Sequence, residues 1–251
     1  MDNLKFKIRS LNKSFGNHHV LKGVDLDVTR DNSLVILGGS GSGKSVLIKL
    51  MIGLLTPDSG SILYEGEDLT YMSSEDKLKM LQNCGYLFQS GALFDSLTIQ
   101  QNITFFAEKI RKLSKSDIKE LAIKKLQSVG LPERVLNLYP SELSGGMQKR
   151  ASLARAICTN PKVIFFDEPT TGLDPIMSNV INNLIIKVRD ELGATTITIT
   201  HDMQSARKIG DEVAFLYEGQ IAWFGKMQDL VHTDNPQLHK FITGDITGDI
   251  D

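Results

Sequence analysis

A glycine-rich segment has the residue types and spacing of a phosphate-binding loop. Residues 38–45 fit the motif G-x-x-x-x-G-K-S, which needs a strand before it and a helix after it. The apolar run 34–37 and the amphipathic stretch 46–55 predict both elements, whereas an ordinary helix opening on a glycine-rich turn is the structural alternative. We expect the loop to bind phosphate through Gly38, Gly39, Ser40, Gly41, Ser42, Gly43, Lys44, Ser45 and Val46. Lys44 would reach the terminal phosphates, and Ser45 would hold Mg²⁺.

A pair of carboxylates follows an apolar run later in the chain. Residues 163–166 predict a strand buried on both faces, and Asp167 and Glu168 come at its end, where open α/β sheets bind ligands. Asp167 would bind Mg²⁺, and Glu168 would polarise the attacking water. Taken alone, such a pair is more typical of a helix cap or a solvated turn.

A third segment opens a helix with two glycines. Ser144 is the predicted N-cap, and Gly145 and Gly146 allow close approach of another backbone. In a plain capped helix these glycines would each cost about 1 kcal/mol without return. A second phosphate contact would compensate for that cost.

These segments need a parallel sheet to position them. Strand 163–166, helix 176–192 and the β-branched strand 195–200 predict right-handed βαβ units. Strands 4–11 and 20–28, joined through Gly16-Asn17, predict an antiparallel lead-in. Hairpins are expected at 61–66 and 213–224, and a short strand at 85–88.

The middle of the chain is predicted to be helical, because Ser114 offers a helix start and apolar residues recur at helical spacing up to Val129. One domain is expected over 1–251, with a core at about 1–92 and 160–235 and a helical subdomain at about 93–159. The tail is expected at about 236–251. Its repeated TGDI units, at 243–250, predict disorder.

Composition limits the function classes. The 251 residues carry 28 basic and 30 acidic side chains and a net charge of −2, which argues against nucleic acid as a partner. Cys84 and Cys158 lack metal-site spacing and predict reduced, buried thiols. With no run approaching eighteen apolar residues, direct insertion into a membrane is not expected.

The three segments, in this order and spacing, resemble the nucleotide-binding subunit of ATP-binding cassette (ABC) transporters over nearly the whole chain. The resemblance implies an α/β fold of the P-loop NTPase class: a RecA-like parallel sheet core, an antiparallel β lead-in and a helical subdomain. It implies ATP and Mg²⁺ as cofactors and ATP hydrolysis as the activity.

Further residues gain roles from this resemblance alone. Gln89 matches the lid glutamine that senses the γ-phosphate and joins the Mg²⁺ ligands, and His201 matches the switch histidine. Asp174 matches the loop that crosses the dimer interface. Phe15 matches the aromatic residue that stacks on adenine, although an aromatic residue on a strand is more often part of the core.

In the family, one chain does not complete its own site, because its signature helix faces the phosphates bound by another chain. The resemblance therefore implies a dimer of two copies around two ATP. Glu168 sets up the attack by water, with Gln89 and His201 beside it, and loss of the γ-phosphate reopens the dimer.

Segment 87–98 is similar to the Mla/Mce-type ATPases. Gly39, residues 147–154 of the signature helix and residues 174–176 fit the same group. ATPases of this group energise phospholipid traffic between the bacterial inner and outer membranes. The resemblance implies a multi-spanning permease, an MCE-type lipid-binding protein and a small STAS-domain protein as partners. It also implies a peripheral position on the cytoplasmic face of the inner membrane.

Two other functions stay open at this point. The core motifs also suit the ATPase of an amino-acid or other small-solute importer, and only segment 90–95 separates the two readings. A soluble ABC ATPase of DNA repair, translation or Fe–S assembly is the other alternative. The single cassette and the lack of a basic stripe argue against it.

Overall fold

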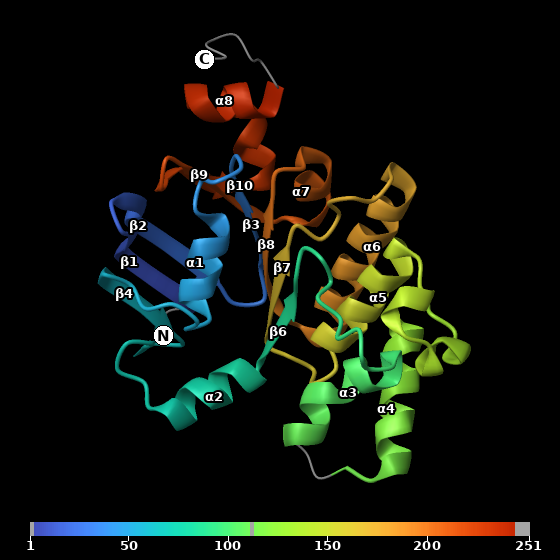
Figure 1. The fold of residues 1–251 in the computed structure, drawn as a ribbon. Helices are drawn as coiled ribbons and strands as arrows, with labels where there is room; N and C mark the ends of the chain where they lie inside the picture. Colours follow the sequence, from blue (N-terminus) through green and yellow to red (C-terminus); the bar gives the residue numbers. More distant parts are fainter. Residues whose placement is uncertain (1–2, 111–112, 244–251) are drawn as a thin grey trace. The chain divides into compact units, whose positions relative to one another are not determined.

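The computed structural model describes residues 3–110 and 113–243 and divides into two compact units (Figure 1). The first unit contains Met1–Lys77 and Ile197–Asp251, and the second contains Leu78–Thr196. The helical subdomain expected at about 93–159 falls within the second unit. The TGDI repeats fall almost entirely at 244–251, outside the described residues, so the disorder expected there stays a prediction.

The first unit carries the antiparallel lead-in as a four-stranded sheet in the order β2-β1-β4-β5. Phe15 pairs with His18, so the turn at Gly16-Asn17 is the only interruption between the first two strands. Both strands are therefore longer than their alternating patterns indicate. The strands are β1 (Leu4–Phe15), β2 (His18–Thr29), β4 (Ser59–Tyr64) and β5 (Glu67–Asp68).

The same unit holds part of a second sheet, in the order β10-β9-β3-β8, with β8 belonging to this unit from Ile197 on. β3 pairs with β9 in parallel, and β9 pairs with β10 as the predicted hairpin. Every residue of β3 is buried, as expected for a strand covered on both faces. The elements are β3 (Ser33–Leu37), α1 (Lys44–Met51), β8 (Thr195–Thr200), α7 (Met203–Ile209), β9 (Glu212–Tyr217), β10 (Gln220–Lys226), the 3₁₀ helix η3 (Met227–His232) and α8 (Pro236–Thr243).

The second unit joins two parallel strands to a group of helices. β6 pairs with β7, with Leu87 opposite Phe166. Leu126 and Leu153 are fully buried where α3, α4 and α5 pack together. The elements are β6 (Cys84–Leu87), α3 (Ile99–Ile110), α4 (Lys115–Ser128), η1 (Glu133–Asn137), η2 (Pro140–Glu142), α5 (Gly145–Ala156), β7 (Val163–Asp167) and α6 (Pro175–Leu192).

Helix ends follow the local capping chemistry. Ser114 and Asp117 form a capping box at the start of α4, as the sequence predicts. Gly193 ends α6 in the left-handed conformation, with φ 55°. The start of α4 and the end of α6 therefore lie where the sequence predicts them.

Two helices differ from expectation. The helix after the glycine loop was predicted to reach residue 55, but α1 ends at Met51, because Gly53 is left-handed (φ 70°) and its N–H bonds back to Leu50 O. Helix α2 (Ser74–Gln82) was not predicted. It is mostly polar and buries one residue, Met80, so its hydrophobic periodicity is weak.

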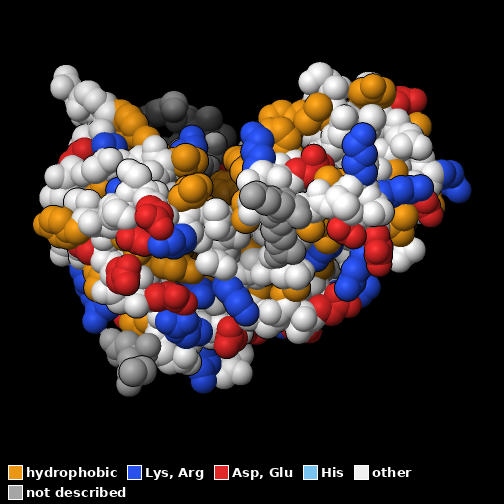
Figure 2. Space-filling view, turned by 90° about the horizontal axis from the view of Figure 1, so that it is seen from below, with side chains coloured by type: hydrophobic (Ala, Val, Ile, Leu, Met, Phe, Trp, Pro, Cys, Tyr) orange, Lys and Arg blue, Asp and Glu red, His pale blue; other side chains and the backbone are white. Residues whose placement is uncertain are grey.

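Acidic and basic side chains are mixed on the surface of the protein. Lys, Arg, Asp and Glu side chains are mixed over the face in Figure 2, with no uniformly basic stripe on it. Within residues 3–110 and 113–243, no helix has both the length and the apolarity needed to cross a membrane. Neither Cys84 nor Cys158 forms a disulfide within the described residues; Cys158 is buried as predicted, whereas Cys84 is half-buried.

Candidate functional site

The glycine loop in the first unit lies between β3 and α1, as predicted. Gly43 is the N-cap of α1 and is left-handed, with φ 103°. A Cβ atom there would come within 2.8 Å of Leu21 Cδ2, and one on Gly38 would come within 2.4 Å of Leu216 O. Only glycine fits these two positions, so the neighbouring backbone fixes the shape of the loop.

Lys44 and Ser42 give the loop its polar interior. Lys44 Nζ donates to the carbonyl oxygens of Gly38 and Gly39, both at 2.8 Å, which holds the ammonium group against the loop. Ser42 Oγ is buried and has no hydrogen-bond partner among the described residues. A buried hydroxyl without a protein partner suits a loop that wraps around phosphate oxygens.

The remaining predicted residues of the first unit are Phe15 and His201. Phe15 ends β1 and is 48% exposed, with Lys13 Nζ 5.5 Å from its ring centroid. It is not a core residue, so the structural alternative for Phe15 is wrong. His201 is exposed and directly follows β8, and Asp202 beside it caps α7 by accepting from Gln204 N and Ser205 N.

The second unit brings three predicted residues together. Because β6 and β7 are parallel and in register at their ends, Gln89 and the pair Asp167-Glu168 follow their strands at the same edge. Lys149 of α5 contacts this edge, and its Nζ donates to the carbonyls of Gln89 and Glu168. Gln89 and the carboxylate pair are therefore neighbours.

Glu168 has an unusual backbone for its residue type. Its φ is 48°, in the left-handed region, and it is buried, with 8% exposed. Thr171 Oγ1 donates to Glu168 Oε2 at 3.0 Å. The left-handed backbone and the hydroxyl donor together orient this carboxylate.

Tyr86 and Lys149 lie beside the carboxylates and were not predicted from sequence. Tyr86 OH lies 3.5 Å from Asp167 Oδ2, and burial together with the charge of Asp167 raises the pKa of the phenol. Burial lowers the pKa of Lys149, and the charges of Asp167 and Glu168 oppose that effect. The available signals were a tyrosine three residues before Gln89 and a lysine that is buried although its helix also carries Arg150 and Arg155.

The segment Ser144-Gly145-Gly146, which we call the signature segment, begins α5 as predicted. Ser144 is the N-cap and accepts from Met147 N at 3.4 Å. Gln148 Nε2 donates to the carbonyl oxygens of Pro140 and Leu143, which fixes the chain ahead of the helix. Ser144 and Gly145 are exposed, so the start of the helix is accessible to a ligand or a second chain.

Asp174 lies near this helix start and also has a structural role. Its Oδ1 accepts from Met177 N at 2.9 Å and caps α6. A Cβ atom on Gly146 would come within 2.5 Å of Met177 Cε, so the start of α6 packs close to the start of α5. The signature segment and the Asp174 loop thus share one exposed region of the second unit.

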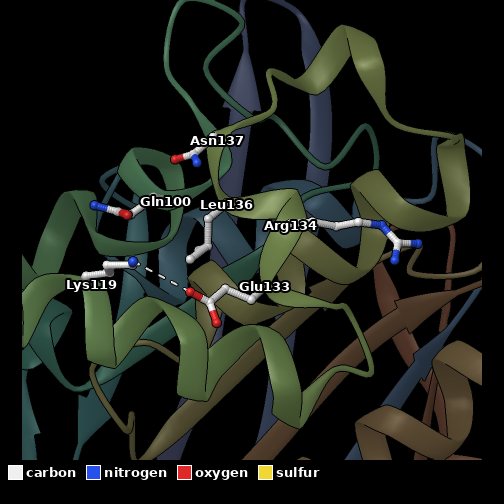
Figure 3. A pocket seen from close by; sticks show the side chains of 6 residues that line it. All are labelled: Gln100, Lys119, Glu133, Arg134, Leu136 and Asn137. Atoms are coloured by element: carbon white, nitrogen blue, oxygen red, sulfur yellow. Dashed lines mark ion pairs between the residues drawn. The ribbon is translucent and has the colours of Figure 1, made fainter.

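A pocket separate from these motifs lies in the helical part of the second unit (Figure 3). Its volume is about 420 Å³, and Lys119 Nζ lies 3.6 Å from Glu133 Oε1 at its wall. The lining side chains are Gln100, Lys119, Glu133, Arg134, Leu136 and Asn137. None of them belongs to the predicted nucleotide motifs.

The described residues contain no cluster of three or more His, Cys, Asp or Glu side chains that could hold a metal ion. Besides the predicted ligands Ser45 and Gln89, a Mg²⁺ ion at Asp167 would take phosphate oxygens and water, as this ion usually does beside nucleotides. The Asp167 carboxylate is an oxygen donor of the kind that Mg²⁺ prefers.

Residues 21–171 match the family described as ABC transporter. Protein TRIGALACTOSYLDIACYLGLYCEROL 3, a chloroplastic protein of Arabidopsis thaliana, is 39% identical over 258 residues, covering 96% of this chain and 74% of its own. The intermembrane phospholipid transport system ATP-binding protein MlaF of Haemophilus influenzae is 34% identical over 244 residues, covering 97% of this chain and 92% of its own.

Solved structures agree with the family match. One is the ATP-binding cassette MJ0796 as a dimer, in a post-hydrolysis state bound to ADP and Pi, with a TM-score of 0.81 and 29% identity. The likeness covers 88% of this chain and 98% of that chain. The predicted fold class and ATPase activity are confirmed, and this chain belongs to the ABC transporter family as an ATP-binding domain that hydrolyses ATP to drive transport.

Proposed function

We propose that this chain powers phospholipid transport between the inner and outer membranes of a bacterium, as an Mla/Mce-type ATPase that maintains lipid asymmetry in the outer membrane. The observation that carries this proposal is the similarity to MlaF, a phospholipid transport ATP-binding protein, over nearly the full length of both chains. Segment 87–98 resembles this group, and its part at 90–95, which separates the group from other importers, adds support from the sequence.

In the proposed site, the glycine loop binds the phosphates of ATP. Backbone N–H groups at 38–46 and the start of α1 face the phosphates, and Lys44 neutralises charge on the terminal ones. Ser45 and Asp167, with Gln89, hold Mg²⁺, which supplies charge stabilisation when bound. The exposed ring of Phe15 stacks on adenine.

Glu168 is the proposed base for hydrolysis. Its carboxylate, oriented by Thr171, polarises a water molecule for attack on the γ-phosphate. Gln89 senses the same phosphate from the lid, and His201 contacts it from the end of β8. These three residues are the proposed catalytic set.

The proposed working unit contains two copies of the chain. ABC cassettes form dimers and work with membrane permeases. Ser144, Gly145 and Gly146 of one copy would bind the ATP held by the other copy's glycine loop, and Asp174 would cross between them. Their exposed position at one end of α5 and α6 supports this arrangement.

Residues 1–251 are proposed to form one ABC ATP-binding domain, with the core, helical subdomain and tail at the expected positions. The proposed partners are multi-spanning permease subunits, an MCE-type lipid-binding protein and a small STAS-domain protein. The complex would place the chain on the cytoplasmic face of the inner membrane.

The test is to purify the chain with its native membrane complex and identify the copurifying proteins and lipids. Phospholipid and an MCE-type protein are the expected result. A complex with a solute-binding protein and no lipid would refute the lipid proposal and favour a small-solute importer, while leaving the ATPase intact. Ribosomes or DNA in place of a permease would overturn the transport role.

A further inference from the structure

One face of α5 contacts the loop that begins at Gln89, which we call the lid loop. Lys149, Ser152 and Arg155 are spaced three residues apart, so they lie along one side of the helix. Each of them contacts the loop that begins at Gln89, and Lys149 also reaches Glu168. This contact pattern is separate from the exposed helix start that is proposed to bind ATP.

Arg155 holds the strained part of the lid loop. Gly91 and Ala92 are both left-handed, with φ 76° and 47°, and for alanine this conformation costs about 1 kcal/mol. Arg155 Nη2 donates to Gly91 O at 2.8 Å, and Nη1 donates to Ala92 O at 2.7 Å. The guanidinium group, 9% exposed, also lies 6.0 Å from the Phe94 ring centroid.

Ser152 brings the helix and the loop into direct contact. A Cβ atom on Gly91 would lie 2.7 Å from Ser152 Oγ, so only glycine allows this approach. From the other side, Asn102 of α3 donates from Nδ2 to the carbonyls of Phe94, Leu97 and Thr98, at 3.1 Å each. The loop therefore has a fixed shape set by the helices around it.

Lys149 connects this loop to the proposed base. Its side chain is buried, with 7% exposed, and Nζ donates both to Gln89 O and, at 3.4 Å, to Glu168 O. The two acceptors belong to different segments, one after β6 and one after β7. A single ammonium group thus sets the spacing between the backbones of the lid glutamine and of Glu168.

Burying an ammonium group costs free energy that a methionine of similar length would avoid. Both carbonyls follow the ends of strands, and Glu168 O also accepts from Thr171 N at 3.3 Å. The turn bond holds Glu168 within its own segment, whereas the charged donor of Lys149 links that segment to the one after β6.

We propose that Lys149 is a positioning residue for ATP hydrolysis, which fixes the backbone of Glu168 relative to the lid loop so that the carboxylate and the lid side chain meet the same γ-phosphate. This inference rests on the proposed role of Glu168 and is independent of the transported cargo. It assigns to the middle of α5 a role distinct from that of its phosphate-facing start.

The test compares Lys149→Met with Lys149→Arg, and uses Lys124→Met, on the exposed side of α4, as the matched control. We expect Lys149→Met to lower kcat about ten- to a hundredfold, because small misplacements of catalytic groups have costs of this order. ATP affinity should change less than about threefold, since the glycine loop is untouched. Lys149→Arg keeps the donors and should recover most of kcat.

A double variant separates positioning from general packing. In a Glu168→Gln background, Lys149→Met should cause little further loss of turnover, because it acts through Glu168. Full kcat in a folded Lys149→Met protein would overturn the inference, and so would an equal loss of kcat, ATP affinity and urea midpoint that arginine does not rescue. Fast turnover by Glu168→Gln alone would instead overturn the role of Glu168.

Discussion

Glu168 is the residue on which the proposed chemistry depends most. Replacing it with glutamine keeps the size of the side chain and an oxygen that can accept from Thr171 Oγ1, but it removes the negative charge. We expect Glu168→Gln to bind ATP normally and to lower turnover about a hundred- to ten-thousandfold, which is the range for losing a general base. Steady-state phosphate release, together with nucleotide binding measured by equilibrium titration, checks both expectations.

Glu191→Gln is the control for this substitution. It removes one carboxylate from the exposed side of α6, where Lys187 is its partner at 3.8 Å. Turnover close to that of the parent is expected. If Glu168→Gln hydrolysed ATP as fast as this control, Glu168 would not be the base.

At the scale of single residues, the sequence identified the groups with a distinctive motif and missed those that act through others. Lys44 and Glu168 lie where the motifs predict. Lys149 and Tyr86 have no motif, because their roles come from tertiary contacts with backbone carbonyls and with Asp167. For Phe15 the sequence allows both a core position and an adenine contact, and its exposure excludes the core position.

The start of α5 allows folding and function to be separated within one element. A Cβ atom on Gly145 would meet no atom within 4 Å in the chain itself. Gly145→Ala should therefore leave the free energy of unfolding unchanged or raise it by up to about 1 kcal/mol. ATPase activity should fall at least about tenfold, because the added methyl group blocks close approach to the other copy's phosphates.

Urea unfolding and phosphate release on the same preparation measure the two effects. A Gly145→Ala protein with normal activity would argue against a phosphate contact at the start of α5. A destabilised protein would show that an unrecognised neighbour already occupies this space.

The β4–β5 turn is expected to make stability depend on pH. Burial alone would raise the pKa of Glu65, but the hydrogen bond and charge of Lys5, and then those of Arg30, leave it lowered from its usual value of 4.5. Its contribution is therefore present above the unfolded pKa and is lost as pH falls through the lower, folded pKa. The contribution should be about 0.5 kcal/mol, since the group is partly exposed.

The measurement is the urea midpoint between pH 7 and pH 3 for the parent and for Glu65→Gln. The variant should lose less stability on acidification than the parent. Glu67→Gln, in the neighbouring strand, removes the same charge from an exposed site and is the control. Equal acid dependence in the parent and Glu65→Gln would show that the ion pairs contribute nothing.

At the scale of elements, the sequence predicted best where the local chemistry is complete. The strand at Thr195–Thr200 and the helix ending at Leu192 match β8 and α6, since β-branched runs, a capping Asp174 and Gly193 specify them locally. Helix α2 was missed because its apolar face is nearly absent. Helix α1 was predicted too long because Leu54 and Leu55, past its end, continued the apolar pattern.

For the whole molecule, the proposal that two copies share each site predicts complementation. Lys44→Ala removes the lysine of the glycine loop, and Gly145→Asp adds a negative charge at the start of α5. Each variant alone should be inactive. Mixed in equal amounts, half of the dimers pair one of each, and each mixed dimer has one intact site, so about one quarter of the parent activity is expected.

The measurement is phosphate release after mixing, over a range of chain concentrations. Activity should depend on concentration, because it requires two chains to meet. If the mixture stayed as inactive as either variant while both still dimerised, the glycine loop and the signature helix would not be completing a site across the interface.

The left-handed backbone of Glu168 has a consequence for how the protein can be engineered. A φ of 48° suits glycine, which has no carboxylate. At this position, the residue that gives the most stable backbone is therefore not one that supports turnover. Libraries selected for thermal resistance alone should enrich substitutions here that abolish hydrolysis, whereas selection for growth on transport should keep the strained glutamate. Thermostable versions of this ATPase are therefore better sought by changes away from residue 168.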